Sequence, residues 1–264
     1  MFSDFPSCCK IDSNITLTAK DINCNSILVI SEKNKKTMKI TFLGQSTLLL
    51  EIGDKKLIVD PFISGNEKAN SIDVDAINVD YILLTHGHQD HVLDVEQIAK
   101  NNPEATLISN YEIVSYYGEK GINGHPMNHG GSKTFDFGTL KYVTAIHSSV
   151  LPDGTYAGNP GGFVLNTDDK CIYIAGDTAL TMDMKLIPMT SPKLDLAILP
   201  VGDNFTMGYK DAAIAADFVE CDTVLGYHFD TFPYIEIDKE QAINHFKSKN
   251  KSLTLLEIGE SITL

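Results

Sequence analysis

The sequence Thr85-His86-Gly87-His88-Gln89-Asp90-His91 places three imidazoles and a carboxylate within six residues. An apolar run, residues 81–84, precedes it, and residues 92–100, with apolar side chains at helical spacing, follow it. This pattern predicts a buried strand, a loop and a helix. The end of such a strand is where an α/β protein presents side chains to a ligand. We therefore interpret the stretch as a metal-binding turn, and not as a histidine-rich surface turn.

Length and charge narrow the class of protein. The chain has 264 residues, of which 43% are hydrophobic and 21% charged, as in a soluble globular domain with a substantial core. No apolar run approaches the roughly 20 residues that cross a bilayer, so no membrane partner is expected. The net charge of −14 disfavours nucleic acid. The expected partner is a small-molecule substrate, and a homo-oligomer is compatible with the sequence.

The cysteines and the N-terminal residues indicate the redox environment of the protein and the start of its folded domain. The five cysteines are odd in number and form no C-x-x-C pair, which predicts reduced thiols in a cytoplasmic protein. Cys171 and Cys221 border apolar runs and are expected in the core. Residues 1–37 lack the pattern of a signal peptide. We expect them to be a flexible extension, an added edge strand or an upstream start, before a functional domain over residues 38–264.

Apolar runs separated by turn residues predict the order of the elements. Strands are expected over residues 39–43, 47–52, 56–59, 81–85, 105–109, 134–137, 140–145, 162–166, 171–175, 194–200, 223–227, 253–258 and 261–264. Helices are expected over residues 92–100, 111–119, 210–220 and 238–249, and loops over 64–78 and 124–131. Strand meanders that alternate with single helices in both halves predict two sheets covered by helices.

Three further metal-binding side chains each follow a predicted strand. They are His147, Asp177 and His228. Together with the four donors of residues 86–91 they make seven, which is enough for two metal ions if one ligand is shared. Within the motif, His86 and His88 are two residues apart and can point the same way. The adjacent Asp90 and His91 diverge, so they suit a second ion.

The remaining histidines are weaker candidates. His125 and His129 lie in a glycine-rich segment, where they either line the mouth of a pocket or are simply exposed. His245 lies in the last predicted helix and is expected to be structural or exposed. Contacts with a substrate are expected from the loops at residues 127–133, 159–162 and 204–207, although tight glycine turns explain Gly161 and Gly162 better.

The chain resembles the metallo-β-lactamase superfamily, whose mark is H-x-H-x-D-H followed by separate His, Asp and His ligands. More closely, it is similar to the UlaG-like small metal-dependent hydrolases. The resemblance covers residues 38–264 and rests on residues 58–62, 85–91, 147–149, 158–163, 175–178, 199–208, 231–233 and 259–261. It implies an αβ/βα four-layer sandwich, in which two mixed β-sheets are flanked by helices and the metals lie at one edge between the sheets.

The resemblance also implies roles for individual residues. His86, His88 and His147 would bind a first metal, Asp90, His91 and His228 a second, and Asp177 would bridge both. Asp60, at a strand end, would orient a ligand, although on sequence alone a turn-capping role is about as good an explanation. Relatives usually carry Gly-His-Ser where this chain has Gly44-Gln45-Ser46. Glutamine is a poor zinc ligand and cannot take up a proton, so any proton-transfer role at this position is in doubt.

The expected activity is hydrolysis of a small ester-type substrate, either a phosphodiester or a lactone. Two divalent ions, zinc by default although manganese or iron also fit, would share the attacking hydroxide. Asp90 or Asp177 would relay its proton to the leaving group. Alternatives are a non-catalytic metal-binding protein and a redox di-iron protein on the same fold. Di-iron proteins usually carry Glu where His88 stands and add a flavin domain. A β-lactamase role is disfavoured because no lysine lies near the later ligands to bind a drug carboxylate.

Overall fold

Three antiparallel strands open the part of the chain that the computed structural model describes, residues 37–264. They are β1 (Met38–Gly44), β2 (Thr47–Ile52) and β3 (Lys55–Val59). Burial alternates over residues 38–42 of β1, because one face of the strand packs on the core and the other meets solvent. The segment predicted as an extension, an edge strand or an upstream start covers residues 1–37, and its residues 1–36 lie outside the described residues.

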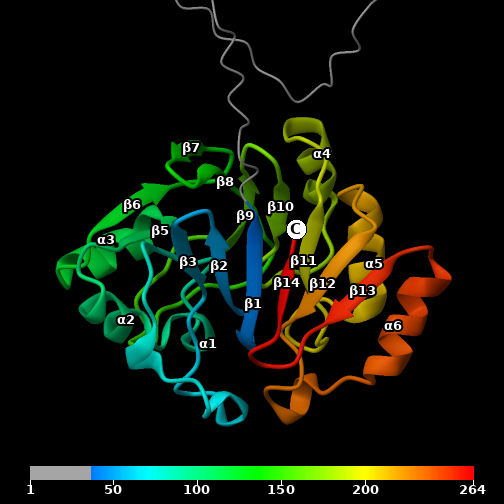
Figure 1. Ribbon diagram of the computed structural model, residues 1–264, viewed down its shortest axis with the longest axis horizontal. Helices are drawn as coiled ribbons and strands as arrows, with labels where there is room; N and C mark the ends of the chain where they lie inside the picture. The colour runs from blue at the N-terminus through cyan, green and yellow to red at the C-terminus, as the bar shows by residue number, and fades with distance from the viewer. Residues whose placement is uncertain (1–36) are drawn as a thin grey trace, which may run out of the picture. The chain divides into compact units, whose positions relative to one another are not determined.

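The first sheet has seven strands in the order β14-β1-β2-β3-β4-β5-β6. Its other members are β4 (Tyr81–Leu83), β5 (Thr106–Asn110), β6 (Gly124–Met127) and β14 (Ser261–Thr263). Strands β3 to β6 run parallel, so their carboxyl ends share one edge of the sheet. Helices α1 (Gln89–Val92), α2 (Val95–Asn101) and α3 (Tyr111–Glu119) lie beside this sheet in Figure 1.

The second sheet also has seven strands, in the order β13-β12-β11-β10-β9-β8-β7. They are β7 (Ser132–Phe135), β8 (Gly138–Thr144), β9 (Gly161–Asn166), β10 (Cys171–Ile174), β11 (Leu196–Pro200), β12 (Thr223–Tyr227) and β13 (Ser252–Leu255). Helices α4 (Leu186–Thr190), α5 (Tyr209–Phe218) and α6 (Lys239–Ser248) lie on its side of the molecule (Figure 1). Four short 3₁₀ helices complete the described elements: η1 (Glu67–Ala69), η2 (Val74–Ala76), η3 (Met182–Lys185) and η4 (Pro233–Ile235).

Two clusters of buried apolar side chains hold these elements together. Their arrangement confirms the predicted four-layer αβ/βα sandwich. One cluster of buried side chains joins the facing sheets and continues under α5 and α6, and a second joins the first sheet to α1, α2 and α3. Every residue of β10 and of β11 is buried, because both faces of these strands are covered. Cys171 and Cys221 are free thiols inside the core, as predicted.

Two local predictions were wrong. Residues 124–127 form the strand β6 and not a loop, because Pro126 is tolerated on an edge strand with only one neighbour, β5. The helix predicted over residues 92–100 is α2, which begins only at Val95, and a separate short helix, α1, precedes it, with Asp94 between the two. The Asp94 carboxylate accepts hydrogen bonds from the backbone N–H of Ile63 (2.5 Å) and Ser64 (3.0 Å), which ties the loop after β3 to this break. Helix α4 was not predicted at all.

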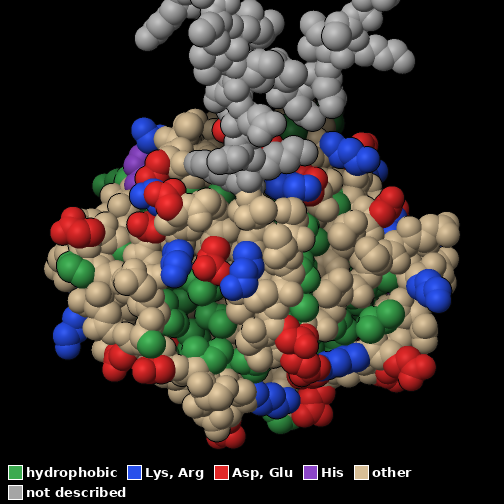
Figure 2. Space-filling model, in the orientation of Figure 1, with side chains coloured by type: hydrophobic (Ala, Val, Ile, Leu, Met, Phe, Trp, Pro, Cys, Tyr) green, Lys and Arg blue, Asp and Glu red, His purple; other side chains and the backbone are tan. Residues whose placement is uncertain are grey.

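The surface is mixed in charge. On the face drawn in Figure 2, acidic side chains are spread among lysines and exposed hydrophobic side chains, so the excess of acid does not gather there into one patch. Among the described residues, no helix combines the length and the apolarity that a membrane crossing requires.

Candidate metal centre

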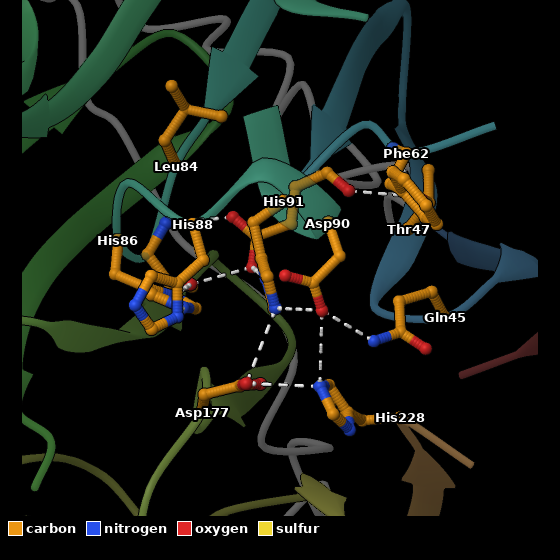
Figure 3. A network of polar contacts seen from close by, with 12 residues as sticks. Gln45, Thr47, Phe62, Leu84, His86, His88, Asp90, His91, Asp177 and His228 are labelled. Carbon is orange, nitrogen blue, oxygen red and sulfur yellow. Dashed lines mark hydrogen bonds and ion pairs between the residues drawn. The ribbon is translucent and has the colours of Figure 1, made fainter. Parts of the chain in front are cut away.

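Seven donor side chains meet where strands of the two sheets end. The loop after β4 supplies His86 and His88, and the short helix α1 supplies Asp90 and His91. The others follow strands of the second sheet, as predicted: His147 after β8, Asp177 after β10 and His228 after β12. Figure 3 shows most of them turned toward a common centre.

His86, His88 and His147 form what we call the histidine cluster, in which one nitrogen of each ring lies within 4.8 Å of the other two. His86 Nε2 is 3.0 Å from His88 Nδ1. Gly87, between them, packs so tightly that a Cβ there would lie 2.4 Å from the Cβ of Ala157. A glycine is therefore required for the two imidazoles to converge at this point.

Asp90, His91, Asp177 and His228 form what we call the mixed cluster. Asp177 Oδ2 lies 3.0 Å from His228 Nε2 and 3.4 Å from His91 Nε2. The same oxygen is 3.6 Å from His147 Nε2, which belongs to the histidine cluster. Asp177 therefore lies between the two clusters, as the predicted bridging ligand must.

Asp60 lies behind both clusters and orients a ring in each. Its carboxylate accepts from the Thr85 hydroxyl (2.6 Å) and backbone N–H (2.8 Å) and from His91 Nδ1 (2.9 Å). Because the Thr85 proton goes to Asp60, the Thr85 oxygen accepts from His86 Nδ1, 3.0 Å away. Both rings thus hold a proton on Nδ1 and turn Nε2 toward the centre. This geometry favours the orienting role over turn capping.

Gln45 contacts two members of the mixed cluster, which sequence reasoning missed. Its side-chain Nε2 donates to Asp90 Oδ2 (2.8 Å), and its backbone oxygen accepts from the N–H of His228 (2.8 Å). Gln45, Asp60 and His228 all have positive φ, at 50°, 45° and 55°. Such conformations persist in non-glycine residues only when the surroundings enforce them. The only signal in the sequence was the departure from Gly-His-Ser.

The two clusters hold protons differently. In the histidine cluster, burial lowers the pKa of all three imidazoles below 6.5, so these rings are neutral at pH 7. In the mixed cluster, burial lowers the pKa of His228 but the Asp177 carboxylate outweighs it and raises this pKa to about 9. The same balance holds at His91. Burial lowers its pKa, but the carboxylates of Asp177, Asp90 and Asp60 outweigh burial and raise it. The pKa of Asp177 is held well below 3.8: burial raises it, and His228 and His91 outweigh that effect.

The donor set fits divalent metal ions. His91 Nε2 and Asp177 Oδ1 are buried and make no hydrogen bond among the described residues, although His91 Nε2 lies 3.4 Å from Asp177 Oδ2, and a cation at the centre would satisfy both atoms. Imidazole nitrogens with carboxylate oxygens are the ligands that zinc, iron and manganese accept. The histidine cluster offers three nitrogens to one ion, and the mixed cluster offers two nitrogens and two carboxylates to another.

The other predicted residues lie elsewhere. His125 packs against Phe135, His129 Nε2 donates to the carbonyl of Pro160 (2.9 Å), and His245 packs against Tyr209. None of the three lines the cavity of about 770 Å³ that opens onto the donors. Of the three loops predicted to contact substrate, only residues 204–207 reach this cavity, through Phe205.

The chain is similar to known proteins over the whole of this centre. Residues 39–228 match the family model described as "Beta-lactamase superfamily domain". A UPF0173 metal-dependent hydrolase from Flavobacterium johnsoniae is 65% identical over 227 residues, which are 86% of this chain and 100% of the relative. Another, from Bacillus mycoides, is 43% identical over 232 residues, with the same coverage of both chains. Among solved structures, a metallo hydrolase from the archaeon Ignicoccus hospitalis superposes with a TM-score of 0.78 at 29% identity, covering 86% of this chain and 98% of its own. The family match spans all seven donors.

Proposed function

This chain belongs to the beta-lactamase superfamily, as one of its metal-dependent hydrolases, and we propose that it cleaves an ester-type bond of a small molecule at a centre of two divalent ions. The predicted resemblance to the superfamily is confirmed. The ester bond, the number of ions and the role of each ligand are our proposal.

The position of Asp177 is the observation that carries the proposal. A single carboxylate oxygen lies within 3.6 Å of imidazole nitrogens from both clusters. A shared carboxylate is what two neighbouring ions require, since it places opposite charge between them. We assign His86, His88 and His147 to one ion, and Asp90, His91 and His228 to the other, with Asp177 common to both.

The residues of the chain then divide the work. When bound, divalent ions lower the pKa of water toward 7 and stabilise the oxyanion that forms on the substrate. Asp90 is better placed than Asp177 to move a proton from the attacking water to the leaving group. Its side chain is 27% exposed at the cavity, whereas that of Asp177 is 3% exposed. Asp60 and Thr85 keep the ring nitrogens of His86 and His91 aimed inward.

One screen identifies both the metal that is bound and the type of bond that is cleaved. Zinc is the first candidate for an imidazole-rich site, with manganese and iron as alternatives. The same centre serves attack on phosphorus in a phosphodiester or on the carbonyl carbon of a lactone. The chain purified with each metal in turn is therefore screened against aryl phosphodiesters and lactones, and its metal content is measured by elemental analysis.

The decisive variant is Asp177→Ala, with Asp183→Ala at an exposed position of η3 as its control. We expect Asp177→Ala to lose bound metal and nearly all turnover, because each metal-linked contribution is worth several kcal/mol. Asp183→Ala is expected to keep both. Wild-type turnover with normal metal content in Asp177→Ala rules the proposal out, and less than one metal ion per wild-type chain favours a non-catalytic binding protein.

A further inference from the structure

The cavity above the metal centre has an apolar wall that the hydrolysis of an ester bond does not by itself require. Five of the donor side chains line it, and they are His88, Asp90, His147, Asp177 and His228. Six residues that hold no metal form the wall, and they are Phe62, Leu93, Phe205, Phe232, Pro233 and Tyr234. They come from four places in the sequence: the loop after β3, the turn after α1, the loop after β11 and the segment after β12.

The wall is built from two aromatic pairs. The rings of Phe62 and Phe232 lie 6.1 Å apart and are tilted by 50°. The rings of Phe205 and Tyr234 lie 6.2 Å apart, edge to face. Phe62 is buried, whereas Phe205 is 52% and Tyr234 74% exposed, so the outer pair leaves large apolar surfaces in water. Such a patch beside a polar site marks a surface that binds an apolar group.

Hydrogen bonds hold the backbone of two segments that form the wall, the one at Phe62 and the one that carries Phe232 and Tyr234. Thr47 accepts from the backbone N–H of Phe62 (2.9 Å), and Figure 3 shows the two residues side by side next to the metal centre. Asp94 holds the two residues that follow Phe62 through their N–H groups. In the segment after β12, the Asp230 side chain accepts from the N–H of Ile237 (3.0 Å), closing the loop that carries Phe232 and Tyr234. A backbone held in this way costs little ordering entropy when a ligand binds.

Charge then decides what kind of substrate suits this cavity. None of the described residues that line it is lysine or arginine, and its carboxylates are the donors Asp90 and Asp177. An anionic substrate such as a phosphodiester would find no cationic side chain there to bind it away from the metal centre. An uncharged substrate can place its carbonyl at the centre and an apolar group against the aromatic wall without leaving a charge unpaired.

We propose that the site is selective for an uncharged carboxylic ester or lactone that carries an alkyl or aryl group, which binds between Phe205, Tyr234 and the Phe62–Phe232 pair. This rests on the proposed hydrolytic function. Water adds to the carbonyl carbon, the acyl C–O bond breaks, and the proton of that water passes to the leaving alkoxide. The products are a carboxylic acid and an alcohol, and no oxidant or reductant is needed.

The test compares γ-decalactone with γ-butyrolactone, which has the same ring without the six-carbon chain, and uses bis(p-nitrophenyl) phosphate as an anionic ester. For the metal-loaded wild type we expect kcat/KM to be at least about tenfold higher for γ-decalactone than for γ-butyrolactone, from burial of the chain. The phosphodiester should be the poorest of the three. Phe205→Ala and Tyr234→Ala should reduce the preference for the longer lactone to below about threefold, mainly through KM. Tyr111→Ala removes a similarly exposed aromatic ring, 61% exposed and away from the cavity, and should leave the preference as it is.

A binding measurement separates this proposal from the proposed function. Calorimetric titration with γ-decalactam and γ-butyrolactam, which keep the ring and the chain but hydrolyse far more slowly, should show at least about tenfold tighter binding of the longer lactam, lost in Phe205→Ala. Tight binding of γ-decalactam without turnover of any ester contradicts the hydrolytic function and supports the wall. Equal turnover of both lactones, equal binding of both lactams, or faster turnover of the phosphodiester overturns the wall proposal.

Discussion

The histidine cluster and the mixed cluster lie side by side, but their imidazoles differ in whether they hold an extra proton at neutral pH. The histidine cluster contains three imidazoles whose pKa values are lowered by burial, so it is ready to accept a cation at neutral pH. The mixed cluster contains two carboxylates, and its imidazoles carry raised pKa values in the metal-free chain. There, protons balance charge that a metal would otherwise balance. The histidine cluster can bind a metal ion without losing protons, whereas the mixed cluster must release protons when it binds one.

Removing one imidazole from each cluster should give the largest effects. His86→Ala and His228→Ala should each lower the metal content from about two ions to about one, because each removes a donor from one cluster only. Each should lower kcat/KM by more than about a hundredfold, a loss of about 3 kcal/mol of transition-state stabilisation. Elemental analysis and steady-state kinetics measure both quantities.

His245→Ala is the control for these variants, since this histidine packs against Tyr209 far from the donors in sequence and outside the cavity. It should keep both ions and its activity. If His228→Ala still binds two ions with unchanged affinity, the division into two clusters is wrong.

The pH dependence of metal binding should separate the clusters next. A His228 pKa near 9 in the metal-free chain means that binding at the mixed cluster displaces a proton at pH 7. Each proton displaced there should raise the affinity by up to about tenfold for each pH unit between 7 and 9. Affinity at the histidine cluster should change little over this range, because its imidazoles are already neutral. Competition titrations with a chelator at pH 7, 8 and 9 measure both affinities.

The same shift affects the stability of the metal-free chain, with a sign that can be checked. The His228 pKa is raised on folding, so its contribution is fully present below pH 6.5 and is lost as the pH rises through about 9. The difference in Tm between metal-loaded and metal-free protein should therefore widen from pH 6.5 to pH 9. A constant difference would mean that His228 holds no proton in the metal-free chain.

Asp60 gives a third way to compare the clusters. Asp60→Asn should weaken metal binding by about 10- to 100-fold. The ion of the mixed cluster should be lost first, because Asp60 contacts His91 directly but reaches His86 only through Thr85. Thr85→Val is the matched variant, since it removes the link to His86 and leaves the contact with His91. It should weaken the histidine cluster instead, and equal losses at both clusters in both variants would contradict this arrangement.

Features that depend on neighbouring residues could be predicted from the sequence, whereas contacts between residues far apart in the chain could not. Strand ends that carry histidine or aspartate are local patterns, so the seven donors were predicted from sequence and the structure brings them together. The αβ/βα sandwich was also predictable, because its strands alternate or run apolar between turns. The strand β6 was missed because Gly124 and Pro126 disfavour a strand in the local sequence. Its pairing with β5 is not visible in a local pattern. The aromatic wall was missed because Phe62, Phe205 and Tyr234 meet only in three dimensions, with no spacing that links them.

Gln45 should have the smallest effect, confined to the mixed cluster. Its amide donates one hydrogen bond to the Asp90 carboxylate, and its buried Oε1 has no partner among the described residues. Gln45→Met keeps a side chain of similar size and cannot donate. It should weaken the ion of the mixed cluster by about tenfold, the value of one hydrogen bond to a charged group, and leave the histidine cluster unchanged. Gln45→His is the informative partner variant, because an imidazole can donate to Asp90 from the same backbone. Metal affinities close to wild type in Gln45→His and reduced in Gln45→Met would show that this position serves to hold Asp90. An equal loss in both variants would instead show that the amide is required for its shape, since donation alone would be restored by histidine.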